Sequence, residues 1–307
     1  MKNPILDVLV PHFQDPAGLR LSLDSVYRQN WSGRLRVIVA DDGSDANSFD
    51  QVQEICREFE ADCDHKTLIL RRDVNKGRPY TRNELLDASE ALHVAWLDAG
   101  DTWAPSKLQQ QFDYLSQLHH GGRNLSETWI TCDYLWEESG HETRRVVQDV
   151  SGDQFKSLMT GDRLRAYLWT LLGTRDSFIR VGYFDNRLAR LQDLDYFVRF
   201  VRGGGKILKP RVNEALASYY KSDIGRNASE VHEAYTLIIE KNHPKLIQYP
   251  RSLTRDLRHK AAKLAARFAL NNGDRSLRLK YELKAMRLKP APASKQLARK
   301  IVNRLTT

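Results

Sequence analysis

Four apolar runs alternate with helix-like segments in the first 118 residues, and this alternation is the strongest constraint on the fold. The expected strands read "ILDVLV", "LRVIVAD", "TLIL" and "LHVAWLD". Their apolar residues are continuous, which is typical of parallel strands that are covered on both faces. Strands that alternate with helices predict an α/β domain, with a mostly parallel sheet between layers of helices. In such sheets, ligands bind beyond the carboxyl ends of the strands.

The rest of the chain has a different pattern. Residues 119–225 contain expected strands in "TWITCDYLW" and "TRRVVQDV", and an expected helix in "LQDLDYFVRFVR", which three glycines end. From residue 226 onward the sequence is typical of helices and becomes increasingly basic. We therefore divide the chain into residues 1–118, 119–225 and 226–307, of which the last part is a basic helical extension.

The positive charge of the chain is concentrated near its end. Residues 251–307 carry 16 Lys or Arg and 3 Asp or Glu, a net charge of +13, whereas the whole chain carries +9. The remaining residues therefore carry −4, and this asymmetry predicts an anionic partner for the tail, either a membrane surface or a nucleic acid. No recognised nucleic-acid-binding module accompanies the basic residues, so we expect no nucleic-acid partner.

Two segments of this tail, residues 252–270 and 294–305, have the pattern of basic amphipathic helices. In the first segment, basic residues lie on the helix away from one apolar face, which is formed by Leu257, Ala261, Leu264 and Phe268. Such helices bind anionic membrane surfaces, so peripheral attachment to the inner face of the cytoplasmic membrane is one expectation. The alternative, for the first segment, is that its apolar face packs on the α/β domain.

The compartment follows from what the sequence lacks. No apolar stretch approaches the roughly 20 residues of a membrane-spanning helix, and the N-terminus does not have the pattern of a signal peptide. Cys56, Cys63 and Cys132 have no metal-type spacing and are expected to be reduced thiols. We therefore expect a cytoplasmic protein.

Two carboxylates end the fourth apolar run, where Asp98 and Asp101 flank Ala99 and Gly100. Carboxylate oxygens are the ligands that Mg²⁺ and Mn²⁺ prefer, with water and substrate phosphates in the other positions. A divalent ion at this turn could neutralise a leaving diphosphate. The alternative is structural, with Asp98 capping the turn and Asp101 capping a helix that begins at Pro105.

Other polar residues stand at the expected ends of strands and helices. Asp41 and Asp42 end the second run, where they could stabilise a turn or accept hydrogen bonds from a base or a ribose. Arg82 lies near a helix start, where anions are favoured. Asp193 stands at the start of a later helix, either as a charge that matches the helix dipole or as a general base for an acceptor hydroxyl.

In order and spacing, these motifs resemble those of the family 2 glycosyltransferases, which have the GT-A fold. The resemblance covers about residues 5–220 and is carried by "DVLVPHFQDPAGLRLSLDSVYRQNWSGRLRVIVADDGSD", "NKGRPYTRNELLDASEALHVAWLDAGDTWAPSKLQQQ" and "VGYFDNRLARLQDLDYFVRFVRGGGK". It implies a Rossmann-like central sheet flanked by helices. It also implies transfer of a hexosyl group, with inversion, from a nucleotide diphosphate donor, usually UDP-linked, to a hydroxyl group.

The resemblance also implies which residues bind the donor. Pro11 and Phe13 match the strand-end segment that lines the nucleotide, and Asp42 matches the acid that contacts the base. Arg82 matches the arginine of the family's "ARN" stretch. Asp98 matches the first acid of the D-x-D-type motif, which also belongs to the donor site.

Two further acids have a role in the chemistry that the resemblance implies. Asp101 matches the metal ligand of the D-x-D-type motif, so Mn²⁺ or Mg²⁺ is the expected cofactor. Asp193 matches the acid of the family's "ED" motif, which is the catalytic base. Residues 1–118 then correspond to the half that binds the nucleotide sugar, and residues 119–225 to the half that binds the acceptor.

Three positions depart from the family's pattern. Gly100 stands where many relatives have Asp, Gln192 where Glu is usual, and Gln14 where Asn is common. These departures keep open an alternative, a catalytically inactive GT-A scaffold or a protein that binds a membrane or nucleic acid through its basic tail. The chain lacks the Q-x-x-R-W motif of processive synthases, so a non-processive enzyme is expected. Family habit indicates a glycan or lipid-linked acceptor in bacterial lipopolysaccharide or capsule synthesis.

Overall fold

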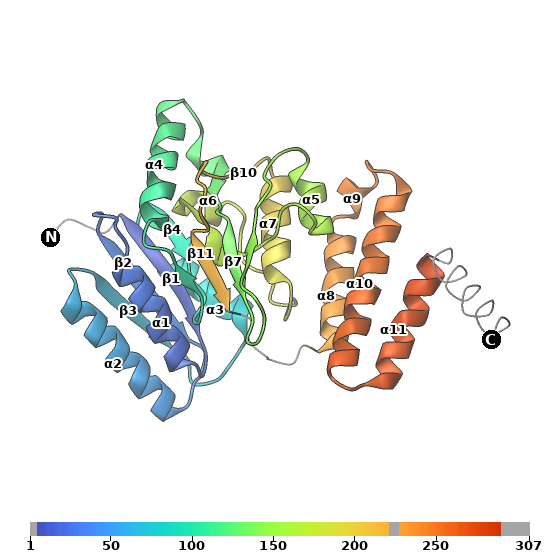
Figure 1. Ribbon diagram of the computed structural model, residues 1–307, viewed down its shortest axis with the longest axis horizontal. Coiled ribbons are helices and arrows are strands. Elements are labelled where there is room, and N and C mark those ends of the chain that lie inside the picture. Colours follow the sequence, from blue (N-terminus) through green and yellow to red (C-terminus); the bar gives the residue numbers. More distant parts are fainter. Residues whose placement is uncertain (1–4, 221–226, 290–307) are drawn as a thin grey trace. The chain divides into compact units, whose positions relative to one another are not determined.

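The computed structural model describes residues 5–220 and 227–289 of the chain (Figure 1). Contacts divide the chain into two compact units. The first unit contains residues 1–187 and 192–222, and the second contains residues 188–191 and 223–307. The predicted site residues all belong to the first unit.

The first unit is built on a sheet of seven strands. In chain order they are β1 (Leu6–His12), β2 (Leu35–Asp41), β3 (Lys66–Arg71), β4 (His93–Trp96), β6 (Thr128–Ile130), β9 (Leu172–Thr174) and β10 (Lys206–Leu208). Their order across the sheet is β10-β6-β9-β4-β1-β2-β3. The four predicted strands β1 to β4 are parallel neighbours, whereas β9 lies antiparallel between β4 and β6. The mostly parallel α/β sheet is therefore confirmed, with one antiparallel strand inside it.

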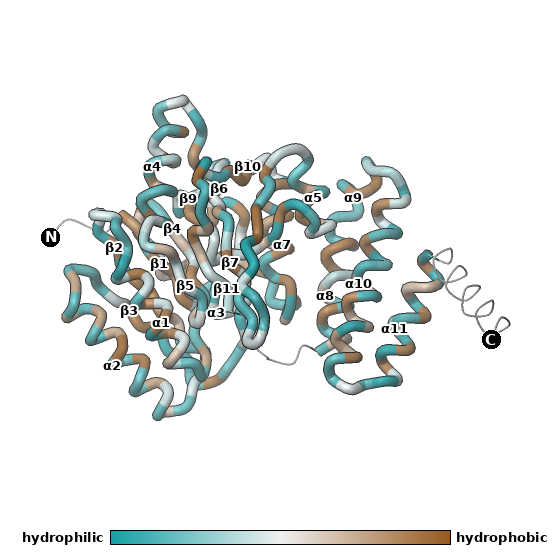
Figure 2. The backbone as a smooth tube through the Cα atoms, viewed as in Figure 1, coloured by the Kyte–Doolittle hydropathy of each residue, from teal (hydrophilic) through white to brown (hydrophobic). Residues whose placement is uncertain are grey.

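Helices cover both faces of this sheet (Figure 1). They are α1 (Pro16–Tyr27), α2 (Ala46–Asp62), α3 (Arg78–Ala88), α4 (Lys107–His120), α5 (Gln154–Thr160), α6 (Arg175–Ile179) and α7 (Gln192–Arg202), with 3-10 turns at Leu125–Glu127 and Leu168–Thr170. Helices α1, α2 and α4 share one apolar core with β1, β2 and β4. On the other face α3 contacts β1 and β2, and Trp96 meets the rings of Phe178 and Phe184. Apolar residues concentrate along the central strands, whereas the helices mix apolar and polar residues (Figure 2).

Two helix starts show how local sequence sets the boundaries. Helix α1 begins at Pro16, because Asp15 accepts a hydrogen bond from the Gly18 N–H at 2.9 Å and Pro suits the first helical position. Helix α4 begins at Lys107 rather than at Pro105. The Pro105 carbonyl accepts a hydrogen bond from the Asn30 N–H at 2.8 Å, which keeps this residue in a turn before the helix.

A smaller sheet of four strands lies in the second half of the first unit. Its strands are β5 (Thr102–Trp103), β7 (Tyr134–Glu137), β8 (Arg144–Val146) and β11 (Ala217–Tyr220), in the order β5-β11-β7-β8. The run "TWITCDYLW" therefore supplies two strands, β6 and β7, to different sheets. The break falls at Asp133, a buried carboxylate that accepts from Arg145 Nη2 at 3.0 Å and from Lys209 Nζ at 2.6 Å.

The second unit is helical, as predicted. Its described helices are α8 (Ala228–Lys241), α9 (His243–Leu246), α10 (Arg251–Asn271) and α11 (Arg275–Leu288). Leu257 and Ala261 of the predicted amphipathic face are buried in α10, which contacts α8 and α11 of the same unit. The second predicted tail helix, residues 294–305, lies outside the described residues. None of the described helices combines the length and the apolar character that crossing a membrane requires.

Candidate active site

The loops after β1 and β2 are joined by a buried network around Asp41. Its carboxylate accepts from His12 Nδ1 at 2.8 Å and from the Ser44 N–H and hydroxyl at 3.1 and 2.5 Å. His12 Nε2 in turn accepts the Asp15 N–H at 3.2 Å, so the ring carries its proton on Nδ1. This use of His12 and Asp41 was not predicted, because it depends on the pairing of two strands that lie 29 residues apart.

Asp42 is bonded mainly to the backbone of the loop before α3. Its carboxylate accepts from the Lys76 N–H at 3.0 Å, from the Gly77 N–H at 2.7 Å and from Arg72 Nη1 at 3.1 Å. A carboxylate can accept about four hydrogen bonds, so Asp42 retains some capacity for a ligand. Gly43 has φ of +78°, and a Cβ there would lie 2.5 Å from the Asn75 nitrogen, which explains the glycine after this acid.

Pro11 and Phe13 lie at the carboxyl end of β1. Pro11 is inside the strand and pairs with Ala40, whereas Phe13 follows the strand with its side chain exposed. Gln14 then adopts a positive φ of 53°, which turns the chain toward α1. Within the described part of the chain, no hydrogen bond or ring contact joins Phe13 to the predicted acids, and the part it would play in binding a nucleotide stays a prediction.

Arg82 brings two of the predicted acids together. It lies in α3 with only 1 % of its side chain exposed. Its Nη1 donates to Asp193 Oδ1, and its Nη2 donates to both oxygens of Asp98 at 3.0 Å. Burial would lower the pKa of Arg82, but the two carboxylates raise it overall, so the guanidinium remains charged. Asp98 and Asp193 thus meet on one cation, although 95 residues separate them in the sequence.

Asp101 lies in a turn that is fixed against α1. Gly100, with φ of +96°, donates its N–H to the Gly18 carbonyl at 3.1 Å and to the Ser22 hydroxyl at 3.0 Å. The Ser22 hydroxyl donates to the Asp101 carbonyl at 2.7 Å. The Asp101 carboxylate accepts the Tyr220 N–H at 3.4 Å, so it does not cap α4 as the structural alternative would require.

The protonation of Asp101 reflects its surroundings. Burial, together with the nearby charge of Asp98, raises the pKa of Asp101 well above its usual range. Arg78 and Arg82 act in the opposite direction but do not compensate, and no described ion pair includes this carboxylate. A cation beside Asp101 would therefore stabilise its ionised form.

Asp193 stands in the first turn of α7, where acids are favoured by the helix dipole. Burial raises the pKa of Asp193 and Asp98 adds to the effect, whereas Arg82 opposes it. A carboxylate with a raised pKa, held on a rigid helix, is suited to proton transfer. The neighbouring Asp195 is fully buried and paired with Arg199 at 2.8 Å, so it stabilises the helix rather than the site.

The acids fit a divalent metal ion that is shared with a substrate. No group of three or more His, Cys, Asp or Glu side chains that could enclose a metal exists among the described residues. The buried carboxylate of Asp101 is nevertheless a hard oxygen ligand that lacks an ion-pair partner in the described structure. Mg²⁺ and Mn²⁺ are commonly bound through one or two carboxylates, with water and substrate phosphates as the other ligands.

An aromatic row extends from Asp101 across the smaller sheet. Tyr219 of β11 pairs in register with Trp136 of β7, their ring centres 4.6 Å apart, and Trp136 pairs with Arg144 of β8. Thr102 pairs with Ser218, so continuing this register by one residue places Asp101 beside Tyr219. The sequence offered one unused signal for this row, the aromatic residues that follow each other closely in "YLW" and "SYY".

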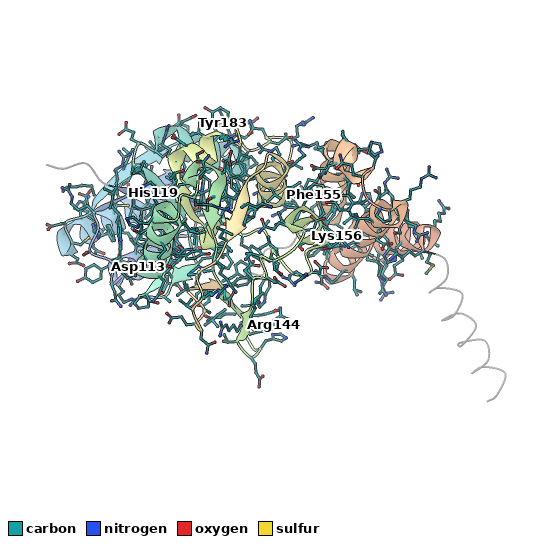
Figure 3. All side chains as sticks on the ribbon, turned by 90° about the horizontal axis from the view of Figure 1, so that it is seen from above. Asp113, His119, Arg144, Phe155, Lys156 and Tyr183 are labelled. Atoms are coloured by element: carbon teal, nitrogen blue, oxygen red, sulfur yellow. The ribbon has the colours of Figure 1, made fainter. Side chains whose placement is uncertain are left out.

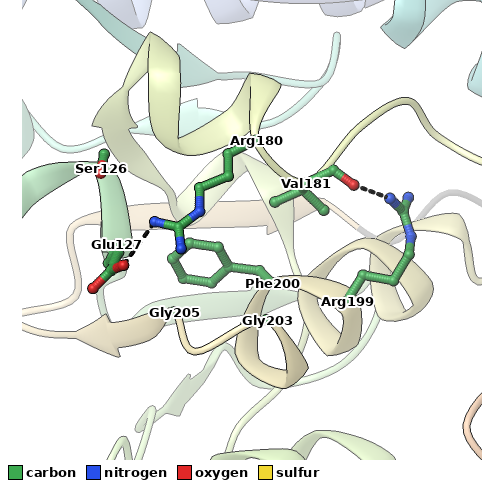
Figure 4. Close-up of a pocket in the computed structure, with 8 residues that line it drawn as sticks. All are labelled: Ser126, Glu127, Arg180, Val181, Arg199, Phe200, Gly203 and Gly205. Carbon is green, nitrogen blue, oxygen red and sulfur yellow. Dashed lines mark hydrogen bonds and ion pairs between the residues drawn. The ribbon is translucent and has the colours of Figure 1, made fainter.

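Two small pockets lie away from these residues. One, of about 50 Å³, lies beside α6 and α7, where Arg180 pairs with Glu127 and Arg199 donates to the Val181 carbonyl at 2.6 Å (Figure 4). The other is lined by α1 and α2 and includes Arg20, which pairs with Glu58. Neither pocket is lined by any of the predicted site residues.

Comparison with known proteins identifies related sequences and folds. Residues 7–123 match the family described as Glycosyl transferase family 2. A putative colanic acid biosynthesis glycosyl transferase of Escherichia coli, WcaA, is 21 % identical over 65 % of this chain and 67 % of its own length. The chain spans about two thirds of the length of the first curated relatives that it matches.

Two solved structures share the fold. Staphylococcus aureus TarS 1-349 in complex with UDP-GlcNAc has a TM-score of 0.61 at 16 % identity, over 92 % of this chain and 79 % of that one. The mannosyltransferase PcManGT of Pyrobaculum calidifontis, in complex with GDP-Man and Mn²⁺, has a TM-score of 0.57 at 17 % identity, over 99 % of this chain and 81 % of that one. The predicted GT-A fold is confirmed.

Proposed function

We propose that this chain, a member of glycosyl transferase family 2, transfers a hexose from a nucleotide diphosphate donor to a hydroxyl group, with inversion and without processivity. One observation carries the proposal. Arg82 joins Asp98, which follows β4, to Asp193, which begins α7, close to the buried carboxylate of Asp101. These acids and the cation lie at the carboxyl end of the parallel strands. This is the end of the sheet at which α/β proteins bind their ligands.

We assign donor binding to residues 1–118 and acceptor binding to residues 119–225. In the first part Pro11, Phe13 and Asp42 would contact the nucleotide, and Arg82 with Asp98 would face the diphosphate-linked sugar. A UDP-sugar is the favoured donor because TarS, which shares the fold, binds UDP-GlcNAc. PcManGT binds GDP-Man, so the experiment below compares the two nucleotide bases, uracil and guanine.

We propose Mn²⁺ or Mg²⁺ as the cofactor, held by Asp101. Support comes from the raised pKa of this carboxylate and from the Mn²⁺ bound to PcManGT. When bound, such an ion supplies positive charge that stabilises a leaving diphosphate.

In the transfer step, Asp193 would take the proton from the acceptor hydroxyl as its oxygen forms a bond to the anomeric carbon. The bond from that carbon to the donor diphosphate breaks, and the diphosphate leaves with the electron pair. Arg82, shared between Asp98 and Asp193, would hold the base in position. A single displacement of this kind inverts the anomeric centre.

For the acceptor, we propose a glycan or a lipid-linked sugar of a bacterial surface polysaccharide. WcaA, a relative, is named for colanic acid biosynthesis. The ring of Trp136, which is partly exposed and meets that of Tyr219, would offer a flat apolar surface on which the C–H face of a sugar ring can stack. The basic helical extension would bring the enzyme to an anionic membrane, where a lipid-linked acceptor resides, from the cytoplasmic side.

The decisive experiment is a calorimetric titration of UDP and GDP in the presence and absence of Mn²⁺, with wild type and Asp101→Asn. We expect UDP to bind with Mn²⁺ and the variant to lose the metal dependence. Asp193→Asn should retain nucleotide binding but lose transfer. If neither UDP nor GDP binds, with or without Mn²⁺, the proposal of a transferase that uses either nucleotide is refuted and the scaffold alternative is favoured.

A further inference from the structure

Helix α11 has two opposite apolar faces. Tyr281 and Ala285 are buried within the second unit, with 4 % and 2 % of their surface exposed. Leu279, Leu283 and Met286 follow at the i, i+4, i+7 spacing of a second stripe, and they are 57 %, 46 % and 46 % exposed. At 3.6 residues per turn, a shift of two residues is about 200°, so this stripe lies on the side of α11 away from its buried face.

Exposed cations lie beside this stripe, three of them on one side of it and Arg275 at its other edge. Arg275, Lys280, Lys284 and Arg287 are exposed on the same helix. Residues 251–289 carry 12 Lys or Arg and 3 Asp or Glu, a net charge of +9. Two of those acids are already paired, Glu282 with Arg278 and Asp256 with Lys289, which leaves an excess of cations on these two helices.

We infer that the stripe of Leu279, Leu283 and Met286 is the face that docks on an anionic lipid bilayer. Helices that lie in a membrane interface combine an apolar face with Lys and Arg on the polar surface beside it. The exposed stripe of α11 and its neighbouring cations match this arrangement, although the opposite face of the helix is apolar as well and packs within the second unit. The apolar side chains enter the acyl boundary, and the cations meet lipid phosphates. This assignment replaces the face of α10 that the sequence indicated, because Leu257 and Ala261 of that face are buried within the second unit.

The inference deepens the proposed membrane association but does not depend on sugar transfer. It is tested by sedimentation of the full chain with phosphatidylcholine vesicles, with and without phosphatidylglycerol. We expect binding only to the anionic vesicles, weaker at high salt. The double variant Leu279→Ser/Leu283→Ser should bind about tenfold more weakly or worse, and Leu283→Trp should bind more strongly.

Leu21→Ser provides the matched control, since Leu21 is an equally exposed leucine in the first unit, at 51 %. Unchanged unfolding temperatures would show that all variants fold, and unchanged nucleotide binding would show that the proposed function is unaffected. Vesicle binding of the double variant equal to that of wild type would overturn the inference. The inference would also be overturned if wild type were a dimer, the double variant were a monomer, and both bound vesicles equally well.

Discussion

Removing the guanidinium that Asp98 and Asp193 share should destabilise the first unit measurably. Arg82→Met keeps the length of the side chain but leaves two carboxylates without their cation. Removing one partner of a buried ion pair costs about 3–5 kcal/mol. The side chains of Asp98 and Asp193 are 23 % and 19 % exposed, so water stabilises them in part. We therefore expect a loss near the lower limit, about 3 kcal/mol at pH 7.

The loss can be measured by thermal unfolding followed by circular dichroism. At ~2–4 °C per kcal/mol, the unfolding temperature of the variant should fall by ~6–12 °C. The deficit should shrink as the pH falls toward ~4, because protonated carboxyl groups no longer require a cation. Adding Asp98→Asn should restore part of the stability. A variant as stable as wild type at pH 7, or a deficit that does not depend on pH, would refute the role given to Arg82.

Three further predictions follow from other described residues. Because the pKa of Asp101 is raised in the folded chain, there is a pH range above 3.8 in which the folded chain keeps a proton that the unfolded chain has released. Within this range, the contribution of Asp101 to the free energy of unfolding falls as the pH rises. Asp101→Asn should flatten that fall in unfolding temperature across pH and remove any stabilisation by Mn²⁺. Burial lowers the pKa of Lys107 from 10.5 to about 8, so replacing this lysine removes an unfavourable buried charge. Lys107→Met also removes the hydrogen bond to Gln111 and the contact of Nζ with the Trp103 ring at 3.9 Å, so the free energy of unfolding at pH 7 should change by less than ~1 kcal/mol. A loss of several kcal/mol in urea unfolding would contradict this. Trp136→Ala should raise the KM for the acceptor ~10-fold and leave donor binding unchanged in steady-state kinetics, whereas Trp31→Ala, which removes an aromatic ring stacked on Phe112, should change neither.

The parts of the fold that the sequence predicts are those that local patterns determine. Strands β1 to β4 follow from continuous apolar runs, and the start of α1 follows from Asp15 and Pro16, which act within one helical turn. The strand β9 has three residues, "LGT", and no pattern that distinguishes it from a loop. These residues form a strand because they pair with β4 on one side and with β6 on the other.

The site shows the same limit at the level of single side chains. The resemblance to a family indicated Arg82, Asp98, Asp101 and Asp193, but not that Arg82 would hold two of the acids at once. Such contacts join residues that are 16 and 111 positions apart, so they depend on the tertiary structure. The roles of these residues in binding and catalysis stay predictions until they are measured.

The antiparallel strand β9 has a consequence for how the chain is synthesised. Strand β4 pairs with β1 on one side and with β9 on the other, so one of its edges stays open until residues 172–174 have left the ribosome. An apolar strand with an open edge can pair with another nascent chain. Prolonged association with a chaperone during this interval is therefore expected, and fragments that end before β9 should aggregate when they are expressed alone.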